Sequence, residues 1–484
     1  MKRFYPTIRV FGVLLTGFSL TLLVPLLLSW HWQDGASSAY DEAFLLALGT
    51  GLGLWWTARH EKRDLKVRDG FLMVVLVWTV LPIYAGLPLV LHLNISFTDA
   101  YFEAVSGLTT TGATVLANLD KLPPSINLWR GMLVWLGGMG LIVLAVAVLP
   151  LLGIGGRQMF KAETPGPMKD SQLTPRLTQT AKGLWVVYTL ITAACILGFR
   201  LGGMSWLDAF VHAFSVMGLG GFSTHDASFG YFDSPLLEGI AVVFMLIASL
   251  NFATHYLALH GRTWEVYRDD PEARWVLLTL IGSVIAIAIY LAVLDVYPDF
   301  LTALRHSAFN VVSIASTTGL ATVDYNLWPA FAPLWMLFLC SFATSAGSTG
   351  GGIKMIRAII LYKQVYRELV RAMHPNAVWP VRVGGSPVPT NVLTAVLAFG
   401  FAYMCIIVAL TLLMSFSGLD VVTGFSAVVA SINNTGPGLN QVGPATTFEV
   451  LTDFQTWVCT FAMLLGRLEI FTLLVVLTPE FWRK

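Results

Sequence analysis

The chain has 484 residues and a net charge of +1 at pH 7, and 56% of its residues are hydrophobic whereas only 12% are charged. Soluble domains carry about 25% charged residues, so this composition excludes an ordinary soluble protein and indicates one that lies in a lipid bilayer. A net charge near zero provides no overall field to attract nucleic acid. The spacing of the cysteines fits neither a metal motif nor a disulfide framework, and we expect buried apolar cysteines at positions 195, 340, 405 and 459.

Long apolar runs, separated by short charged connections, predict ten membrane-spanning helices. A run of about 20 apolar residues crosses a bilayer, so the first run is a retained helix, longer than the apolar core of a signal peptide. The predicted spans are residues 10–30, 43–56, 70–91, 129–149, 184–202, 236–257, 275–296, 328–342 with a continuation at 353–362, 392–416 and 457–477. Ten passes place both termini on one side of the membrane.

The distribution of lysine and arginine predicts that this side is the cytoplasm. With both termini inside, most of the 29 lysines and arginines fall in cytoplasmic stretches, as the positive-inside rule requires. The exceptions are Lys121, Arg130, Arg200 and Arg305 at the outer edge and Arg467 inside a predicted span. The basic stretches 157–182 and 354–382 suit an acidic partner or lipid headgroups, and ordinary solvated loops explain them as well.

Four shorter elements lie between the predicted spans. Each is a helical pattern of roughly a dozen residues, too short to cross a bilayer and typical of a re-entrant segment, followed by a turn rich in Gly, Thr or Ser. In each turn a small residue precedes the final glycine by six positions. The four are turn 1 (residues 106–112), turn 2 (215–221), turn 3 (313–319) and turn 4 (430–436). We expect Asp99, Asp208, Thr302 and Asp420 to cap the half-helices before them.

The repeat predicts an all-α integral membrane fold. Two leading helices (1–69) precede four units of span, half-helix, turn and span, which we expect to surround a pore with pseudo-four-fold symmetry. The unit boundaries are residues 70–160, 161–274, 275–385 and 386–484.

The four turns are suited to binding a dehydrated cation. Such an ion exchanges its water for carbonyl oxygens around an axis, and irregular backbone at membrane depth is tolerated where it lines a cavity. Glycine reaches the necessary backbone angles, and the preceding half-helix directs its negative end at the site. The candidate filter residues are Thr110, Thr111, Gly112, Leu219, Gly220, Gly221, Thr317, Thr318, Gly319, Asn434, Thr435 and Gly436. The alternative is that the small residues only allow helices to pack closely.

Residues 343–352 interrupt a predicted span with Thr, Ser and Gly, which a continuous helix disfavours. We interpret this segment as a mobile constriction beneath the filter, with a simple structural kink as the alternative. The candidate gate residues are Gly347, Ser348, Thr349, Gly350, Gly351 and Gly352.

Arg467 lies near the middle of the last predicted span, where a charge is costly and usually functional. We expect it to face the pore as an electrostatic barrier and to bond carbonyls of residues 343–352. Glu469 lies on another side of the helix and is no easy partner. The alternative is a structural arginine at a subunit contact.

Five strings resemble the membrane subunits of Trk-type potassium uptake systems, in the Trk/Ktr/HKT superfamily. They are Gly-Gly-Phe-Ser-Thr-His-Asp-Ala-Ser (220–228), Lys-Ala-Glu-Thr-Pro-Gly-Pro (161–167), Ala-Gly-Ser-Thr-Gly-Gly-Gly-Ile-Lys (346–354), Asn-Asn-Thr-Gly-Pro-Gly (433–438) and Gly-Arg-Leu-Glu-Ile-Phe-Thr (466–472). The resemblance implies a transporter of potassium, and of rubidium, with no organic cofactor and no enzymatic activity. It further implies a homodimer in the lipid of a bacterial inner membrane, gated by a cytosolic nucleotide-binding subunit.

The resemblance also bears on ion selectivity. In plant relatives a serine in place of the first filter glycine is associated with sodium transport, whereas all four turns here end in glycine. Turn 2 departs locally, because Leu219 and Gly220 stand where turns 1 and 3 have two threonines, so we expect only backbone carbonyls from it.

Three other functions are alternatives to a potassium pore. A secondary symporter that couples potassium to protons or sodium at a midplane site predicts two inverted halves, and both passive and coupled flux are consistent with the sequence. An intramembrane enzyme needs a paired nucleophile and base, and a receptor leaves the four glycines unexplained. We expect His212, His225 and His306, which lack the spacing of metal ligands, to make structural hydrogen bonds.

Overall fold

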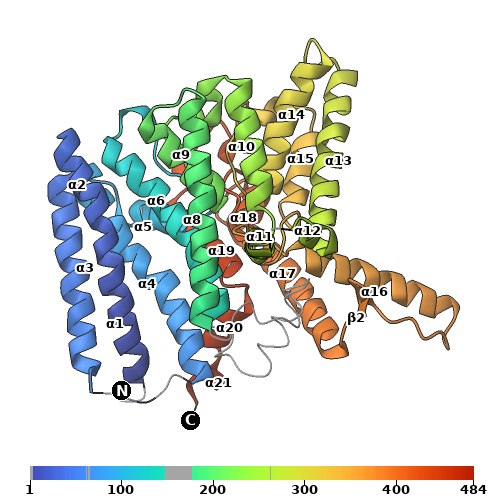
Figure 1. Cartoon of the computed structure of the whole chain (residues 1–484), viewed down its shortest axis with the longest axis horizontal. Coiled ribbons are helices and arrows are strands. Elements are labelled where there is room, and N and C mark those ends of the chain that lie inside the picture. The colour runs from blue at the N-terminus through green and yellow to red at the C-terminus, as the bar shows by residue number, and fades with distance from the viewer. Residues whose placement is uncertain (1–3, 61–62, 64–65, 148–176, 262, 484) are drawn as a thin grey trace.

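A computed structural model describes residues 4–60, 63, 66–147, 177–261 and 263–483. The end of the fourth predicted span, the string 161–167 and most of the basic stretch 157–182 lie outside these residues. The described chain is mostly helical. Both termini lie at the same end of the molecule (Figure 1), as an even number of passes requires.

Two leading helical segments stand side by side at one edge of the molecule (Figure 1). The first span, Tyr5–Trp32, is built from α1 (Tyr5–Ser19), η2 (Leu20–Leu22) and α2 (Leu23–Trp32). The second segment is α3 (Ser37–Ala58), which is longer than the predicted 43–56.

The remaining elements follow one order four times: a long helix, a short helix, a turn and a second helix. Unit 1 contains α4 (Val67–Leu93), α5 (Phe97–Leu108), η3 (Leu119–Lys121) and α6 (Pro124–Ala147). Unit 2 contains α8 (Leu177–Leu201), α9 (Trp206–Gly218), η6 (Ser228–Phe232), α10 (Pro235–Ala248), α11 (Phe252–Gly261) and α12 (Glu265–Asp269). Unit 3 contains α13 (Pro271–Val293), α14 (Phe300–Ala315), η7 (Tyr325–Leu327), α15 (Phe331–Leu339), α16 (Met355–Met373), β1 (Arg382–Val383) and β2 (Ser386–Pro387). Unit 4 contains α17 (Thr390–Phe416), α18 (Val421–Ile432), η8 (Asn440–Val442), η9 (Phe448–Val450), α19 (Asp453–Arg467), α20 (Phe471–Leu477) and α21 (Pro479–Trp482).

The caps of the short helices differ from the prediction in three of four cases. Ser96 and Ser205 are the N-caps of α5 and α9, and their hydroxyls accept from the backbone N–H groups of Asp99 and Asp208 at 3.1 Å. The two aspartates therefore lie in the first turn, where their charge complements the helix dipole. In unit 3 the cap is Asp299, which accepts from the backbone of Thr302. Asp420 caps α18, as predicted.

Two predicted spans are not continuous helices. The 236–257 segment bends by 94° between α10 and α11, and the 457–477 segment bends by 112° between α19 and α20. Arg467 is consequently the last residue of α19 and lies at the bend. The predicted interruption near residue 343 is confirmed, because α15 ends at Leu339 and α16 begins at Met355.

The breaks affect how many helices qualify as spans by length and apolar composition. Within the described residues five helices qualify, or seven when each bent pair counts as one span. Ten passes therefore stay a prediction. Three cysteines are buried as expected, but Cys405 is exposed on α17. A span that faces lipid accounts for an exposed apolar cysteine.

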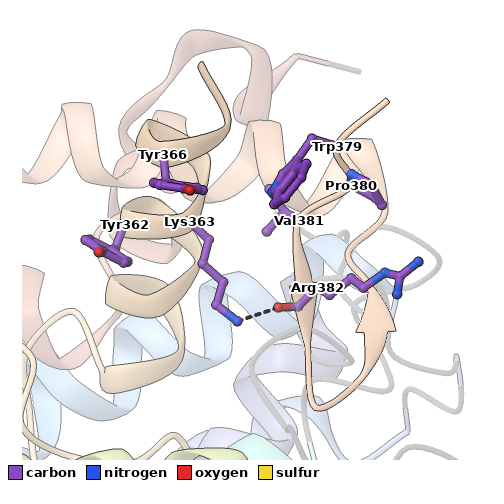
Figure 2. A pocket seen from close by; sticks show the side chains of 7 residues that line it. All are labelled: Tyr362, Lys363, Tyr366, Trp379, Pro380, Val381 and Arg382. Carbon is purple, nitrogen blue, oxygen red and sulfur yellow. Dashed lines mark hydrogen bonds between the residues drawn. The ribbon is translucent and has the colours of Figure 1, made fainter. Parts of the chain in front are cut away.

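The helix α16 projects sideways from the body, and a hairpin of β1 and β2 lies beside it (Figure 1). Between them is a pocket of about 530 Å³. Figure 2 shows aromatic rings from both sides of this pocket and the hydrogen bond of 2.8 Å from Lys363 Nζ to the carbonyl of Arg382. The pocket is lined by Tyr362, Lys363, Tyr366, Trp379, Pro380, Val381 and Arg382.

Candidate functional site

The four turns meet one another in sequence order, and turn 4 meets turn 1. A Cβ atom on Gly112 would overlap the backbone of Gly221, and one on Gly221 would lie 2.9 Å from the carbonyl oxygen of Gly319. A Cβ atom on Gly319 would overlap the carbonyl of Thr435 in turn 4. One on Gly436 would lie 2.7 Å from the carbonyl oxygen of Thr111 in turn 1. The sequence-predicted turn residues are therefore brought together in a closed ring that has no room for side chains at the glycines.

The four turns have the same backbone conformation at equivalent positions, with one exception. The residue two positions before the final glycine is left-handed in every turn, with φ of 56° at Thr110, 54° at Leu219, 66° at Thr317 and 54° at Asn434. Three final glycines are also left-handed, with φ between 77° and 94°, whereas Gly221 is not. The expectation that glycine supplies a special backbone conformation thus holds at three turns, and at Gly221 the close approach of turn 3 is the reason for glycine.

Serine hydroxyls tie three of the turns to their own short helices. Ser106, Ser215 and Ser313 donate to the carbonyl that follows the final glycine of their turn, at 2.6, 2.5 and 2.6 Å. These are the small residues that precede the glycine by six. The prediction used only the small size of these residues, and the hydrogen bond made by the serine hydroxyl was missed.

A second polar side chain, nine positions before the glycine, fixes the segment after each of the first three turns. Glu103 accepts from Thr114 Oγ1 at 2.9 Å, His212 Nε2 bonds Ser223 Oγ at 2.9 Å, and Asn310 donates to Thr322 Oγ1 at 2.8 Å. The sequence analysis missed Glu103 and Asn310, although a polar residue at one repeated position in apolar half-helices was the available signal. The expected structural role of His212 is confirmed.

Glu103 also belongs to a buried ion pair that joins turns 1 and 2. Arg130 Nε lies 2.8 Å from Glu103 Oε1, and both side chains are 1% exposed. The guanidinium donates to the carbonyl of Ser223 at 3.1 Å and stacks over the ring of Phe222 at 4.3 Å. Arg130 was predicted only to lie at the outer edge of the membrane, and its structural role was missed.

A histidine beyond turn 2 links the same two units at the rim of the ring. His225 Nδ1 bonds a carboxylate oxygen of Asp120, its Nε2 lies 3.3 Å from Asp208, and its ring stacks on Tyr231. Burial alone would lower the pKa of His225, but the hydrogen bonds to Asp208 and Asp120 outweigh it and raise that pKa above the ordinary value. His306, the third histidine considered, stacks on Tyr297.

A small cavity of about 70 Å³ opens at this rim. It is lined by residues of all four units, including Gly112, Gly221, Gly319 and Pro437. Three of the four ring glycines therefore border an open space on the side of the polar loops.

The central loop, residues 340–354 between α15 and α16, contains all six predicted gate glycines, serines and threonines and packs against three turns. Thr349 Oγ1 donates to the carbonyl of Met217 at 2.9 Å, beside turn 2. The N–H of Gly351 donates to Thr317 Oγ1 of turn 3 at 3.0 Å, and a Cβ atom on Gly351 would overlap the carbonyl of Asn433 in turn 4.

The other gate candidates shape the central loop itself. Gly347 and Gly352 both have φ of 78°, and the carbonyl of Gly347 accepts from Phe252 N at 3.1 Å. Ser348 bonds the carbonyl of Ser345 at 2.7 Å, and Gly350 accepts from Lys354 Nζ.

Arg467 reaches the central loop, in agreement with its predicted partners. Its Nη1 donates to the carbonyl of Thr349 at 3.0 Å, and its Nη2 donates to the carbonyl of Gly137 in α6 at 2.9 Å. The side chain is 3% exposed. Glu469 pairs with Arg357 at 2.5 Å.

Glu272 at the start of α13 was missed, and it ties the central loop to the first turn of α16. Its Oε1 accepts from the N–H groups of Ala346 at 3.1 Å and Ile356 at 2.8 Å. The available signal in the sequence was an acidic residue at the edge of a predicted span.

Comparisons with known proteins agree on one family. The family model described as TrkH, cation transport protein, matches residues 37–484. The Trk system potassium uptake protein TrkH of Salmonella typhimurium is 46% identical over 478 residues, which cover 98% of this chain and 99% of that protein. The corresponding protein of Vibrio parahaemolyticus is 46% identical over the whole of both chains. The crystal structure of the potassium transporter TrkH from Vibrio parahaemolyticus superposes with a TM-score of 0.91 at 44% identity, over 99% of this chain and 100% of that one. The chain therefore belongs to the TrkH family of cation transport proteins.

Proposed function

We propose that the chain takes up potassium ions through a pore whose selectivity filter is the ring of four turns. One observation carries the proposal: glycines from four separate segments touch in a closed ring that excludes side chains, so backbone oxygens are the groups left to face an ion. Carbonyl oxygens replace the hydration shell of potassium in such filters. The relatives are named as potassium uptake proteins.

The surroundings of the ring support a cation as its cargo. Each turn directly follows the C-terminal end of a short helix, α5, α9, α14 or α18, and that end carries a partial negative charge. We assign the filter to the twelve predicted residues of the turns and expect rubidium to pass as potassium does. The proposed unit boundaries and the pseudo-four-fold arrangement of ten spans follow from the same repeat.

We assign the gate to the central loop with Arg467. The loop is packed beneath three of the turns, and Arg467 fastens it to α6 through two carbonyls. The movement of such a loop away from the ring would open the path that it obstructs. Arg467 would act as a latch on the closed position in addition to any electrostatic effect on a passing cation.

The proposed setting is a bacterial inner membrane with both termini in the cytoplasm, where the basic stretches would lie. A homodimer and a cytosolic nucleotide-binding subunit are expected from the family resemblance. The projecting α16 and its hairpin offer such partners an exposed surface at the end of the molecule that holds the termini (Figure 1).

Flux through proteoliposomes that contain only the purified full-length chain tests the function. We expect uptake of K⁺ and Rb⁺ well above uptake of Na⁺, and no uptake into empty liposomes. Equal rates for K⁺ and Na⁺, or no uptake at all, would contradict the proposal. Repeating the measurement with an imposed pH or sodium gradient separates passive flux from coupled transport, because only coupled transport accumulates K⁺ against its own gradient.

A further inference from the structure

One residue in each short helix holds the start of the ring segment. This residue lies six positions before the final glycine, and its carbonyl accepts from the N–H of the residue just before that glycine. The four hydrogen bonds are Thr111 to Ser106 at 2.8 Å, Gly220 to Ser215 at 2.9 Å, Thr318 to Ser313 at 2.8 Å and Thr435 to Ala430 at 2.9 Å.

In three turns the same residue also holds the end of the segment. The hydroxyls of Ser106, Ser215 and Ser313 donate to the carbonyls of Ala113, Phe222 and Leu320, each one position after the final glycine. All three serines are fully buried, where water cannot substitute for a lost hydrogen bond. A single serine thus clamps both ends of the segment that contributes to the ring.

Turn 4 has only half of this clamp. Ala430 provides the carbonyl, but alanine has no hydroxyl for the carbonyl of Pro437, the residue after Gly436. Other side chains hold the rest of this turn: Asn434 Nδ2 donates to Thr111 Oγ1 and to the carbonyl of Met463, both at 3.0 Å, and the N–H of Leu439 donates to Ser426 Oγ at 2.9 Å. The carbonyl just after the final glycine is therefore fixed by a serine hydroxyl in three turns, whereas turn 4 has no such hydroxyl.

We propose that Ser106, Ser215 and Ser313 are positioning residues that set the spacing of the filter carbonyls and hence the preference for potassium over sodium, and that turn 4 is the compliant quarter of the ring. The proposal rests on the proposed function of the ring as a filter. A segment that is clamped at both ends cannot move its filter carbonyls inward toward a smaller ion, so three clamped turns keep the ring too wide to replace the hydration shell of sodium. Turn 4 retains enough freedom to adapt as ions enter and leave.

Serine-to-alanine substitution tests the clamp in the full-length protein in proteoliposomes. Ser106→Ala, Ser215→Ala and Ser313→Ala should each lower the K⁺/Na⁺ permeability ratio by roughly fivefold to tenfold, the range expected for one neutral hydrogen bond. The three serines lie in different turns, so if one variant fails to fold, the other two still test the clamp. Ala430→Ser supplies the missing hydroxyl in turn 4 and should raise the ratio.

Ser307→Ala is the matched control. Ser307 lies in the same helix as Ser313, is fully buried and donates to the carbonyl of Val284 at 2.9 Å, away from the ring. Its loss should lower thermal stability as Ser313→Ala does and leave the permeability ratio unchanged. An equal fall in the ratio for Ser307→Ala would overturn the positioning role, because the effect would then come from general loosening of α14.

The outcomes also separate this proposal from the function it rests on. If the wild-type chain conducts K⁺ selectively while all folded serine variants keep its ratio, the clamp is wrong and the filter stands. If Ala430→Ser leaves the ratio unchanged, turn 4 is not the compliant quarter. If the wild-type chain does not select K⁺, the filter itself is wrong.

Discussion

The four turns and the central loop meet at one place in the molecule, but they are held in different ways. In the first three turns, side chains of the preceding short helix hold the turn: Ser106, His212 and Asn310 bond atoms 7, 11 and 12 residues further along the chain. The side chains that fix the central loop come from far away. Glu272 bonds atoms 74 and 84 residues distant, and Arg467 bonds one 118 residues distant.

This difference suggests how one protein can combine a fixed filter with a movable gate. A turn that is held by its own helix keeps its geometry when the units shift relative to one another. A loop that is held by units 2 and 4 as well as by its own unit loses contacts when the units shift. We therefore expect changes in the turns to alter which ion passes and changes at the central loop to alter how fast ions pass.

The largest effect is expected from a methyl group in the ring. Gly319→Ala should reduce K⁺ flux by at least roughly 100-fold, equivalent to about 2.7 kcal/mol, because the added Cβ would overlap the carbonyl of Thr435 and the residue has φ of 84°. Flux assays on the purified variant measure this loss. Gly418→Ala is the control, since Gly418 has φ of 92° with open space around its Cβ position. It should retain most of the flux, and an equal loss there would mean that backbone strain, not the ring contact, is responsible.

The buried ion pair behind turns 1 and 2 should give the next largest effect. Arg130→Met leaves the Glu103 carboxylate buried without its partner, which costs about 3–5 kcal/mol, and should lower both the unfolding temperature in detergent and the K⁺/Na⁺ ratio. Arg371→Met removes a pair with Glu368 in which the two side chains are 51% and 53% exposed, so it should cost less than about 1 kcal/mol. Equal losses of stability in the two variants would contradict a special role for the buried pair.

A change at the central loop should alter the rate and spare the ratio. Arg467→Ala removes two charge-assisted hydrogen bonds, each worth about 1.5–3 kcal/mol, so flux should rise roughly tenfold or more at an unchanged K⁺/Na⁺ ratio. An unchanged or lower rate in a folded variant would instead indicate a purely structural arginine.

Arg467→Lys separates a latch from an electrostatic barrier. Lysine keeps the positive charge but lacks the planar fork that reaches the carbonyls of both Thr349 and Gly137. A latch predicts increased flux in this variant as in Arg467→Ala, whereas a barrier predicts that flux stays low.

The sequence was informative where structure depends on neighbouring residues. The half-helices, the four turns and the interruption near residue 343 are local patterns, and all are present. The bend after α10 was not predictable, because the 236–257 run is continuously apolar and the bend is stabilised by distant backbone bonds, such as Ser345 N to Ser249 O at 2.9 Å. The bend after α19 likewise depends on left-handed Glu469 and Ile470 and on the pairing of Glu469 with Arg357.

The same difference between local patterns and distant contacts applies to the residues of the candidate site. The ring residues were predicted from their repeat, and so was the contact of Arg467 with the central loop. Glu272 and Arg130 were missed, because the partner of each lies in a segment that only the folded chain brings near. The predicted caps of α5, α9 and α14 were wrong by one turn of helix. In α5 and α9 the serine and the aspartate three positions after it are both good caps, and the sequence pattern does not rank them.

The smallest predicted effect concerns the rim of the ring, where turn 2 is held across units as the central loop is, but by partly exposed groups. His225 bridges Asp120 and Asp208, and its pKa is raised in the folded protein. Its ion pairs therefore stabilise the fold fully below the unfolded pKa of about 6.5, and that contribution is lost as the pH rises through the higher folded pKa.

The unfolding temperature of the wild type should exceed that of His225→Gln by more at pH 6 than at pH 8. The gap at pH 6 should be small, because exposed ion pairs contribute less than about 1 kcal/mol, and 1 M salt should narrow it further. A gap that is the same at both pH values would show that His225 acts here only through its stacking on Tyr231, and the rim would then resemble the locally held turns more than the central loop.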